Sequence, residues 1–384
     1  MSLYNPEKIP PVAAQTVARI DRRLPFPGEV LVRIGQRVET EDIIARALVP
    51  ATPRIVNVAG DLAVPITQTA RMLRVKQGDA VRLGQVLART PAALGRTSTA
   101  PVAGVLTAFD PRTGYATITP DPQEISLQAA MLGFVMDILP FRGVTLETPA
   151  AQVYGAFGVG SERSGVLRLM VTDPTEPITA EMIDERSTFA ILIGGVGITA
   201  AGLRRAVEKQ VRGIILGSMA EPELRQWFSA THPVASAGAL LRNLTSGREH
   251  ADLGTTLVLT EGFGTQPMSS AVFDLLSSND RQEALIVGTT RIHRPLLRPR
   301  VIIPLRRSGI TASIAADQPL RVGATVRLRD YAHLGQQGVI RAVSTLPRRL
   351  PFGVQVMAVD VELPSGETLW LPRTAVELLA MASA

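Results

Sequence analysis

A duplicated segment within the first 110 residues constrains the fold more than any other feature of the sequence. Residues 32–38 recur as 75–81 at an offset of 43 positions, and residues 43–46 recur as 86–89 at the same offset. Each copy carries a glycine between two short apolar runs, and glycine supplies the positive φ of a tight turn. A sheet of such short strands needs a second layer of structure to bury its apolar face. The repeat therefore predicts a small two-layer β-sandwich in which the two copies stack on each other.

This duplicated region resembles the biotinyl/lipoyl-like barrel-sandwich hybrid family over residues 24–120. The resemblance lies in the Gly-x-x-Val spacing, the apolar pairs that follow it, and the stretch 100–106. In carrier members of that family, the hairpin between the halves presents a modified lysine. Here the joining segment 49–54 contains no lysine, and Lys76 lies in the turn of the second copy. The resemblance implies the fold without an attachment site, and we expect no cofactor.

The middle of the chain has a different pattern. The continuous apolar run 189–193 is typical of a strand buried on both faces. Thr199 is a suitable N-cap for the amphipathic segment that follows it. Further strands and helices are expected to alternate at 213–217, 221–228, 255–259 and 268–276. This alternation predicts βαβ units in a parallel, Rossmann-like α/β layer.

Three glycine-containing loops follow the expected strands of that layer. Ligands of parallel sheets bind beyond the carboxyl ends of the strands, where backbone N–H groups and helix N-termini favour an anion. The loops indicate a small anionic ligand as one hypothesis, although neither G-x-G-x-x-G nor a P-loop is present. Ordinary turn chemistry is the alternative. The candidate ligand-binding residues are Gly194, Gly195, Gly197, Thr199, Gly217, Ser218, Thr260, Glu261 and Gly262.

The side chains available for catalysis are few. The chain has no cysteine, which excludes disulfides and thiolate metal sites, and its four histidines are too dispersed for a local metal site. Glu261 is the best-placed carboxylate, and Ser218 would need a base such as His232 to act as a nucleophile. We therefore expect no catalytic residues and no metal, and an enzyme that uses the glycine loops remains an alternative.

Positive charge is concentrated in the C-terminal third. Residues 284–350 contain twelve arginines and two aspartates, a net charge of +10 in a chain whose total is +6. This asymmetry indicates a polyanionic partner, either RNA or an acidic protein face, and a solvated surface is the alternative. Trp370 is interpreted as a core residue. The candidate contact residues are Arg298, Arg300, Arg306, Arg307, Arg327, Arg329, Arg341 and Tyr331.

The same region contains two glycine-turned stretches, 321–328 and 335–343, that resemble a KOW motif. The resemblance covers about residues 320–379 and implies a small SH3-like barrel of the kind found in ribosomal and transcription-elongation proteins. RNA- or ribosome-associated binding is therefore the second functional hypothesis.

These observations predict a multidomain protein of β and α/β parts: a barrel-sandwich hybrid, a Rossmann-like α/β layer and an SH3-like barrel. We expect a non-catalytic adaptor or scaffold with a protein partner. No apolar stretch reaches the ~20 residues of a membrane span, and no signal peptide is evident, so we expect a cytoplasmic protein without membrane contact. The expected boundaries are an N-terminal extension at 1–23, the β-sandwich at 24–120, a β-rich connection at 121–180, the α/β domain at 181–290, a basic linker at 291–319 and the barrel at 320–384.

Overall fold

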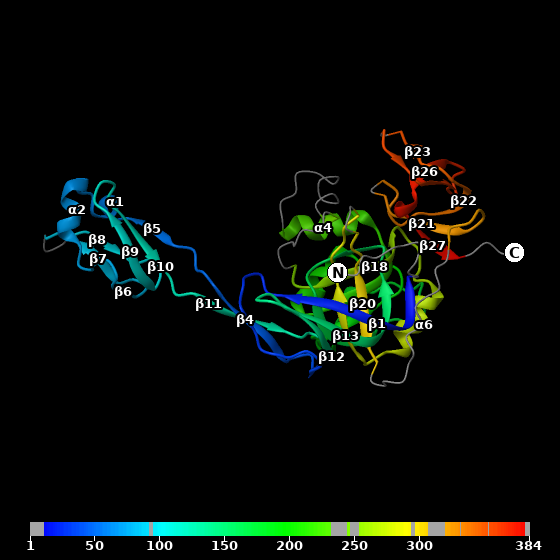
Figure 1. Cartoon of the computed structure of the whole chain (residues 1–384), viewed down its shortest axis with the longest axis horizontal. Helices are drawn as coiled ribbons and strands as arrows, with labels where there is room; N and C mark the ends of the chain where they lie inside the picture. The colour runs from blue at the N-terminus through cyan, green and yellow to red at the C-terminus, as the bar shows by residue number, and fades with distance from the viewer. Residues whose placement is uncertain are drawn as a thin grey trace.

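The structure is a computed structural model that describes residues 11–91, 95–231, 244–245, 253–292, 296–305, 319–330, 332–351 and 353–380. Strands account for 45% and helices for 15% of the described residues, so this part of the protein is β-dominated with several sheets. A central body, an outlying module and a C-terminal sheet can be distinguished (Figure 1). Within the described residues, no helix has both the length and the apolar character needed to cross a bilayer.

One eleven-stranded sheet forms the frame of the body. Its middle strands are almost entirely buried and rich in Ile, Leu and Val, which is why they pair in the interior rather than at an edge. In spatial order the strands are β14 (Phe157–Val159), β18 (Thr256–Phe263), β17 (Gly213–Met219), β16 (Ala190–Ile193), β15 (Arg163–Leu169), β19 (Glu283–Val287), β20 (Arg300–Pro304), β13 (Gly143–Tyr154), β12 (Gly133–Leu139) and β3 (Arg37–Val38), with β1 (Val12–Arg23) paired to β13.

Four neighbouring strands of this sheet, β15, β16, β17 and β18, run parallel. The helices that connect or follow them are α3 (Ala200–Glu208), α4 (Glu221–Thr231) and α6 (Ser270–Ser278), preceded by the short 3-10 turns η1 (Ala180–Met182) and η2 (Glu185–Ser187). Thr199 caps α3 by accepting a hydrogen bond from Gly202 N–H at 3.2 Å. The expected alternation of strands and helices and the expected parallel pairing are thus present.

The large sheet extends beyond the expected α/β segment in both directions along the chain. The twelve-residue strand β1, which lies entirely within the expected N-terminal extension, pairs with β13 over most of its length. β20 joins β19 to β13 and so connects the parallel strands to the antiparallel ones. The expected boundaries at residues 23, 120, 180 and 290 therefore do not coincide with the ends of this sheet.

The first copy of the repeat lies at the antiparallel end of the body. It contributes β3 to the large sheet, and its β4 (Ile43–Val49) pairs with β2 (Glu29–Val30) and β11 (Gln123–Gln128) in a three-stranded sheet. Its Val32, Val38 and Ile44 are buried in a cluster with Val135 and Leu146 of the neighbouring strands.

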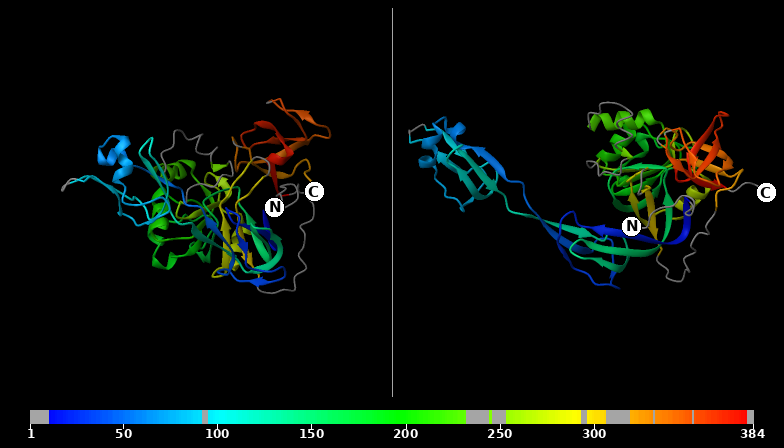
Figure 2. Two further views of the ribbon diagram at one scale, coloured as in Figure 1. Left: turned by 60° about the vertical axis from the view of Figure 1, so that its left-hand side comes forward. Right: turned by 45° about the horizontal axis from the view of Figure 1, so that its top comes forward.

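Residues 54–119 form the outlying module, which stands away from the body on an arm made by β4 and β11 (Figures 1 and 2). The second copy of the repeat lies here, and its Val75, Val81 and Leu87 belong to a separate hydrophobic cluster. The module contains β5 (Arg54–Asn57), α1 (Val58–Leu62), α2 (Ile66–Met72), β6 (Ala80–Val81), β7 (Val86–Arg89), β8 (Thr97–Thr99), β9 (Gly104–Asp110) and β10 (Tyr115–Thr119).

The two copies of the repeat form the same turns, which explains why their sequences match. Gly35 and Gly78 both adopt positive φ, at 81° and 96°. In the first copy Gln36 Oε1 accepts a hydrogen bond from the N–H of Arg33 at 3.1 Å. In the second, Asp79 Oδ2 accepts from Lys76 N–H at 2.7 Å, again 43 positions later. The repeat is therefore a repeat of local geometry.

The expectation that the two copies stack on each other is wrong. They lie in different hydrophobic clusters at opposite ends of the arm. The physical reason is that other segments supply the second layer for each copy. The first copy packs on the large sheet, whereas the second packs on β9, β10 and the helix α1, whose Val58 and Leu62 are buried in the module.

The C-terminal part is a five-stranded antiparallel sheet with its own buried cluster. The expectation that Trp370 is a core residue is wrong: the side chain lies outside that cluster, and the guanidinium of Arg348 stacks 3.8 Å from the ring centroid. In spatial order the strands are β26 (Thr368–Pro372), β25 (Ala358–Glu362), β22 (Gln337–Val343), β21 (Thr325–Leu328) and β27 (Val376–Ala380), with the short pair β23 (Arg348–Arg349) and β24 (Gln355–Val356) and the turn η3 (Arg373–Ala375) beside them.

Candidate functional site

The candidate ligand loops meet at one edge of the body, as expected for parallel strands. β16, β17 and β18 end side by side, and Ser218 is paired with Gly262 across β17 and β18. The loop 194–197 and Thr199 lead from the end of β16 into α3. The structure thus brings all nine candidate ligand residues to this strand-end edge.

The chain itself fills the space beside these glycines. A Cβ on Gly195 would lie 2.4 Å from the carbonyl oxygen of Pro174, and one on Gly217 would lie 2.3 Å from the backbone nitrogen of Met268. The hydroxyl of Ser218 donates to the carbonyl oxygen of Gln266 at 2.7 Å. Glycine is therefore required at these two positions because backbone from neighbouring segments packs directly on them.

The anion position at the start of α3 is occupied by a side chain of the protein. The N–H of Ala200 donates to Glu223 Oε2 at 2.7 Å, so a carboxylate from α4 already interacts with the positive end of this helix. The anion site at the glycine loops stays a prediction, and the contacts of these loops favour a packing role.

Glu261 and Gly262 contact the C-terminal sheet. Glu261 Oε1 accepts a hydrogen bond from the N–H of Ser269 at 3.2 Å, and its Oε2 pairs with the guanidinium of Arg327. Arg327 Nη1 also donates to the carbonyl oxygen of Thr260 at 2.7 Å. A Cβ on Gly262 would meet the Cα of Gly335 at 2.7 Å. The C-terminal sheet therefore covers the end of β18.

A buried ion network extends from this contact, and we call Glu261, Arg298, Arg327 and Glu377 the interface network. Glu377 pairs with Arg298, and its Oε2 lies 3.5 Å from Arg327 Nη1. Arg298 also donates to the carbonyl oxygens of Gly155 and Tyr154, at 2.8 and 3.1 Å. The network connects the ends of β13 and β18 in the body to β21 and β27 in the C-terminal sheet.

The charge state of Glu377 follows from its surroundings. Burial raises the pKa of its carboxyl, but the charges of Arg298, Arg327 and Arg329 outweigh that effect and lower the pKa below its ordinary value. Glu377 is therefore ionised at neutral pH and balances positive charge in a site where an uncompensated ion is strongly unfavourable.

The burial of three candidate polyanion-binding arginines corrects a sequence-based prediction. Arg298, Arg327 and Arg329 are only 5%, 2% and 2% exposed, so the prediction that they face an external partner is wrong. Their charge serves the contact between the C-terminal sheet and the body. The high arginine density of this region is in part a feature of an internal interface.

The other candidates for a polyanion surface are scattered. Arg300 donates to the carbonyl oxygen of Arg19 at 3.2 Å, and Arg341 pairs with Glu362. Arg306, Arg307 and Tyr331 lie outside the described residues. The described arginines of this set thus do not form one open surface.

The three residues considered for catalysis are not brought together where the structure describes them. Ser218 donates to the Gln266 carbonyl, whereas Glu261 is engaged by Ser269 and Arg327. His232 lies outside the described residues. Over the described parts of the chain, no group of three or more histidine, aspartate or glutamate side chains could hold a metal ion.

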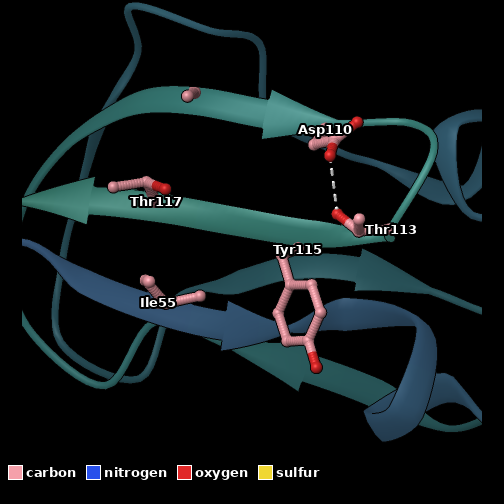
Figure 3. Close-up of a pocket in the computed structure, with 6 residues that line it drawn as sticks. Ile55, Asp110, Thr113, Tyr115 and Thr117 are labelled. Carbon is pink, nitrogen blue, oxygen red and sulfur yellow. Dashed lines mark hydrogen bonds between the residues drawn. The ribbon is translucent and has the colours of Figure 1, made fainter.

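A surface that the sequence analysis did not identify lies on the outlying module. The outer face of β5, β9 and β10 carries a shallow hollow of about 350 Å³, lined by Ile55, Ala108, Asp110, Thr113, Tyr115 and Thr117 (Figure 3). Ile55 is 70% exposed and Tyr115 43% exposed, on adjacent strands. We call this surface the outer face of the module.

One carboxylate lies in the hollow. Asp110 accepts hydrogen bonds from the N–H of Arg112 and the hydroxyl of Thr113, at 2.9 and 2.8 Å. The hydrogen bond from the Arg112 N–H has the largest effect on the pKa of Asp110, followed by that from the Thr113 hydroxyl. Together they hold this pKa below its ordinary value. The outer face therefore combines exposed apolar groups, hydroxyls and one fixed negative charge.

One sequence pattern does indicate that β10 has an exposed face. In residues 115–119 the buried Ala116 and Ile118 alternate with Tyr115 and Thr117, the period-two pattern of a half-buried strand. That Ile55 lies on the same face follows from its pairing with Thr117 across β5 and β10. Sequence alone does not specify this register.

Known proteins provide no assignment for either surface: no family model matches this chain, and no curated protein matches it.

Proposed function

We propose that this protein is a non-catalytic adaptor or scaffold whose outlying module docks a protein partner at a distance from the body. The observation that carries the proposal is the arm. Residues 54–119 have their own hydrophobic cluster and connect to the body through the segments 50–53 and 120–122 that extend β4 and β11. A module held in this way reaches a partner without obstruction by the body.

The architecture that we propose for the parts follows the resemblances in the sequence. The first copy of the repeat and the outlying module are each proposed to derive from a barrel-sandwich hybrid, with the module inserted at the hairpin of the first. The parallel strands and their helices are proposed to be Rossmann-like, and the C-terminal sheet SH3-like. The identical turns at Gly35 and Gly78 support the first of these assignments.

The outer face of the module is the proposed docking surface. Ile55 and Tyr115 lie on adjacent strands with their side chains accessible, and Thr113 and Thr117 add hydroxyl groups around them. An aromatic and an aliphatic anchor surrounded by polar groups is the composition of a protein–protein hot spot. A protein partner with a complementary apolar patch is the occupant that this chemistry fits.

The contacts of the strand-end edge support a non-catalytic role. The hydroxyl of Ser218 and both oxygens of Glu261 already have partners within the protein. A Ser nucleophile needs a base within hydrogen-bonding distance, and the described contacts of Ser218 include none. The side chains most suited to chemistry thus act as structural groups.

The proposal is tested with the tagged full-length chain and the double variant Ile55→Asp/Tyr115→Ala. A partner that survives nuclease treatment is captured from native lysate, purified and titrated against each chain. Loss of two hot-spot anchors is expected to weaken its binding by about 30-fold or more. The matched control is Leu83→Asp, which replaces another exposed apolar side chain of the same module and is expected to change affinity by less than about threefold.

Two results contradict this proposal. Equal affinity of the partner for the double variant and the control would show that the outer face does not dock it. Enzyme-like turnover of a metabolite by the purified full-length chain would show that the protein is not an adaptor alone.

A further inference from the structure

The outlying module carries most of the net charge of the protein. Residues 54–119 contain eight basic and three acidic side chains, a net charge of +5, which leaves only +1 for the remainder of the chain. All eight basic side chains are exposed. The three aspartates are each engaged as hydrogen-bond acceptors within the module. The module is therefore a strongly basic body at the end of an arm.

Four of its arginines come from three segments that lie side by side. Leu73 forms an antiparallel bridge with Ala88, and the N–H of Arg74 donates to the Leu87 carbonyl at 2.8 Å. β7 in turn pairs with β8, with Arg89 opposite Thr97. Neighbouring strands lie about 5 Å apart, so the residues at and beside these paired positions are close in space. We define Arg71, Arg74, Arg89 and Arg96 as the distal arginine cluster.

The cluster is open to a partner. Its segments, α2, β7 and β8, lie at the end of the module that points away from the body (Figure 1). Among the described contacts, Arg71, Arg74 and Arg96 take part in no ion pair. One carboxylate lies nearby, since Asp61 accepts a hydrogen bond from the hydroxyl of Ser98 at 2.6 Å. The four arginines are thus exposed, and the carboxylate of Asp61 lies near them.

The chemistry of the cluster favours phosphate. Guanidinium groups bind phosphate oxygens with two parallel hydrogen bonds, and several of them in a row match a chain of phosphates. A surface that inserts into a lipid bilayer carries exposed large apolar side chains beside its basic ones. Among the described residues beside these paired positions, Val86 is the one exposed large apolar side chain, at 37%, and the exposed Ile66 lies at the opposite end of α2 from Arg71. The composition therefore favours a nucleic acid over a membrane.

We propose that the distal arginine cluster binds the phosphate backbone of a nucleic acid without sequence preference. The cluster lies on the layer formed by α2, β7 and β8, whereas the outer face lies on β5, β9 and β10. The two surfaces thus belong to different layers of one module. This proposal goes beyond the adaptor function and holds or fails independently of it. If both proposals hold, the outlying module contacts a protein through its outer face and a nucleic acid through the distal arginine cluster.

The test uses fluorescence anisotropy with the full-length chain and labelled RNA and DNA duplexes of one sequence. Four phosphate contacts predict that raising salt from about 50 mM to about 200 mM weakens binding by about 150-fold. Because the contact is to phosphate, the RNA and DNA affinities are expected to agree within about threefold. The quadruple Arg→Gln variant at positions 71, 74, 89 and 96 is expected to bind at least about 30-fold more weakly and to lose most of the salt dependence.

The matched control removes the same charge from elsewhere. Arg33, Arg204, Arg321 and Arg349 are exposed arginines of the body and the C-terminal sheet, and their replacement by glutamine should weaken binding by less than about fivefold. All substituted side chains are exposed, so circular dichroism and the Tm of both variants should match the wild type.

Three results overturn the proposal. One is equal weakening by the two quadruple variants, which would attribute binding to total charge. Another is wild-type affinity for both duplexes weaker than about 100 μM at low salt, the level of weak non-specific binding. The last is retention of the chain by phosphatidylserine vesicles, abolished in the cluster variant, without duplex binding. None of these results bears on the capture of a protein partner by the outer face.

Discussion

Replacing Glu377 with glutamine tests whether the interface network fastens the C-terminal sheet to the body. Glutamine has the same shape as glutamate, so the change removes a charge without opening a cavity. Arg298 and Glu377 have fully buried side chains, and Arg327 is nearly so. Removing one partner of a buried ion pair destabilises a protein by about 3–5 kcal/mol, because the other charge is left uncompensated.

The contacts of the arginines place the expected effect of E377Q at the lower end of that range. Arg327 retains Glu261 and the Thr260 carbonyl, and Arg298 retains the carbonyl oxygens of Tyr154 and Gly155. By opening we mean the local transition in which the C-terminal sheet separates from the body. We expect the free energy of this opening to fall by about 3 kcal/mol, which is about a 100-fold change in the opening equilibrium.

Hydrogen exchange followed by mass spectrometry measures this opening directly. Peptides from β21 and β27 should exchange about 100-fold faster in E377Q, whereas those from β9 and β10 in the outlying module should be unchanged. The exposed Glu367, changed to glutamine, is the matched control and should alter exchange by less than about threefold. An increase below about fivefold in β21 and β27 would refute the reasoning that the network holds the interface.

Three further predictions concern the interface network and the glycine loops. Because the pKa of Glu377 is lowered in the folded state, its contribution to stability is complete above the ordinary value of 4.5 and is lost as the pH falls through the folded pKa. The gap in urea-unfolding stability between wild type and E377Q should therefore narrow below that pH, and a constant gap would contradict it. Gly217→Ala, whose Cβ would lie 2.3 Å from the Met268 nitrogen, should lower stability by about 1–3 kcal/mol, read as a fall in Tm. Millimolar phosphate should leave the wild-type Tm unchanged, and a rise would return the glycine loops to the role of an anion site.

The repeat shows how far local sequence determines structure. The turns at Gly35 and Gly78 recur because each needs a glycine with positive φ. Each also needs a side chain, that of Gln36 or Asp79, that accepts a hydrogen bond from the backbone N–H three residues before it. Both requirements are local and can be predicted from the sequence. The layer against which each copy packs is supplied by residues far away in the chain, such as Val135 for one copy and Ile118 for the other.

The arginines of the C-terminal third also show the difference between what local sequence indicates and what long-range contacts decide. The sequence shows twelve of them between residues 284 and 350, and net charge alone indicates a polyanionic surface. It does not show that Arg298 and Arg327 are matched by Glu377 and Glu261, which are 79 and 66 positions away from them. The positive charge of the outlying module is harder to recognise in the sequence than that of residues 284–350, because the module has fewer basic residues per length of chain.

The sequence by itself determined the strands and helices of the middle segment, their parallel order and the glycine turns of the repeat, because hydrophobic periodicity and backbone conformation depend on neighbouring residues. Only the tertiary structure decided that the two repeat copies separate, that the C-terminal sheet covers the end of β18, and that Ile55 and Tyr115 share an accessible face. Those outcomes depend on which distant surfaces are buried together, and burial is a property of the assembled chain that short-range patterns do not specify.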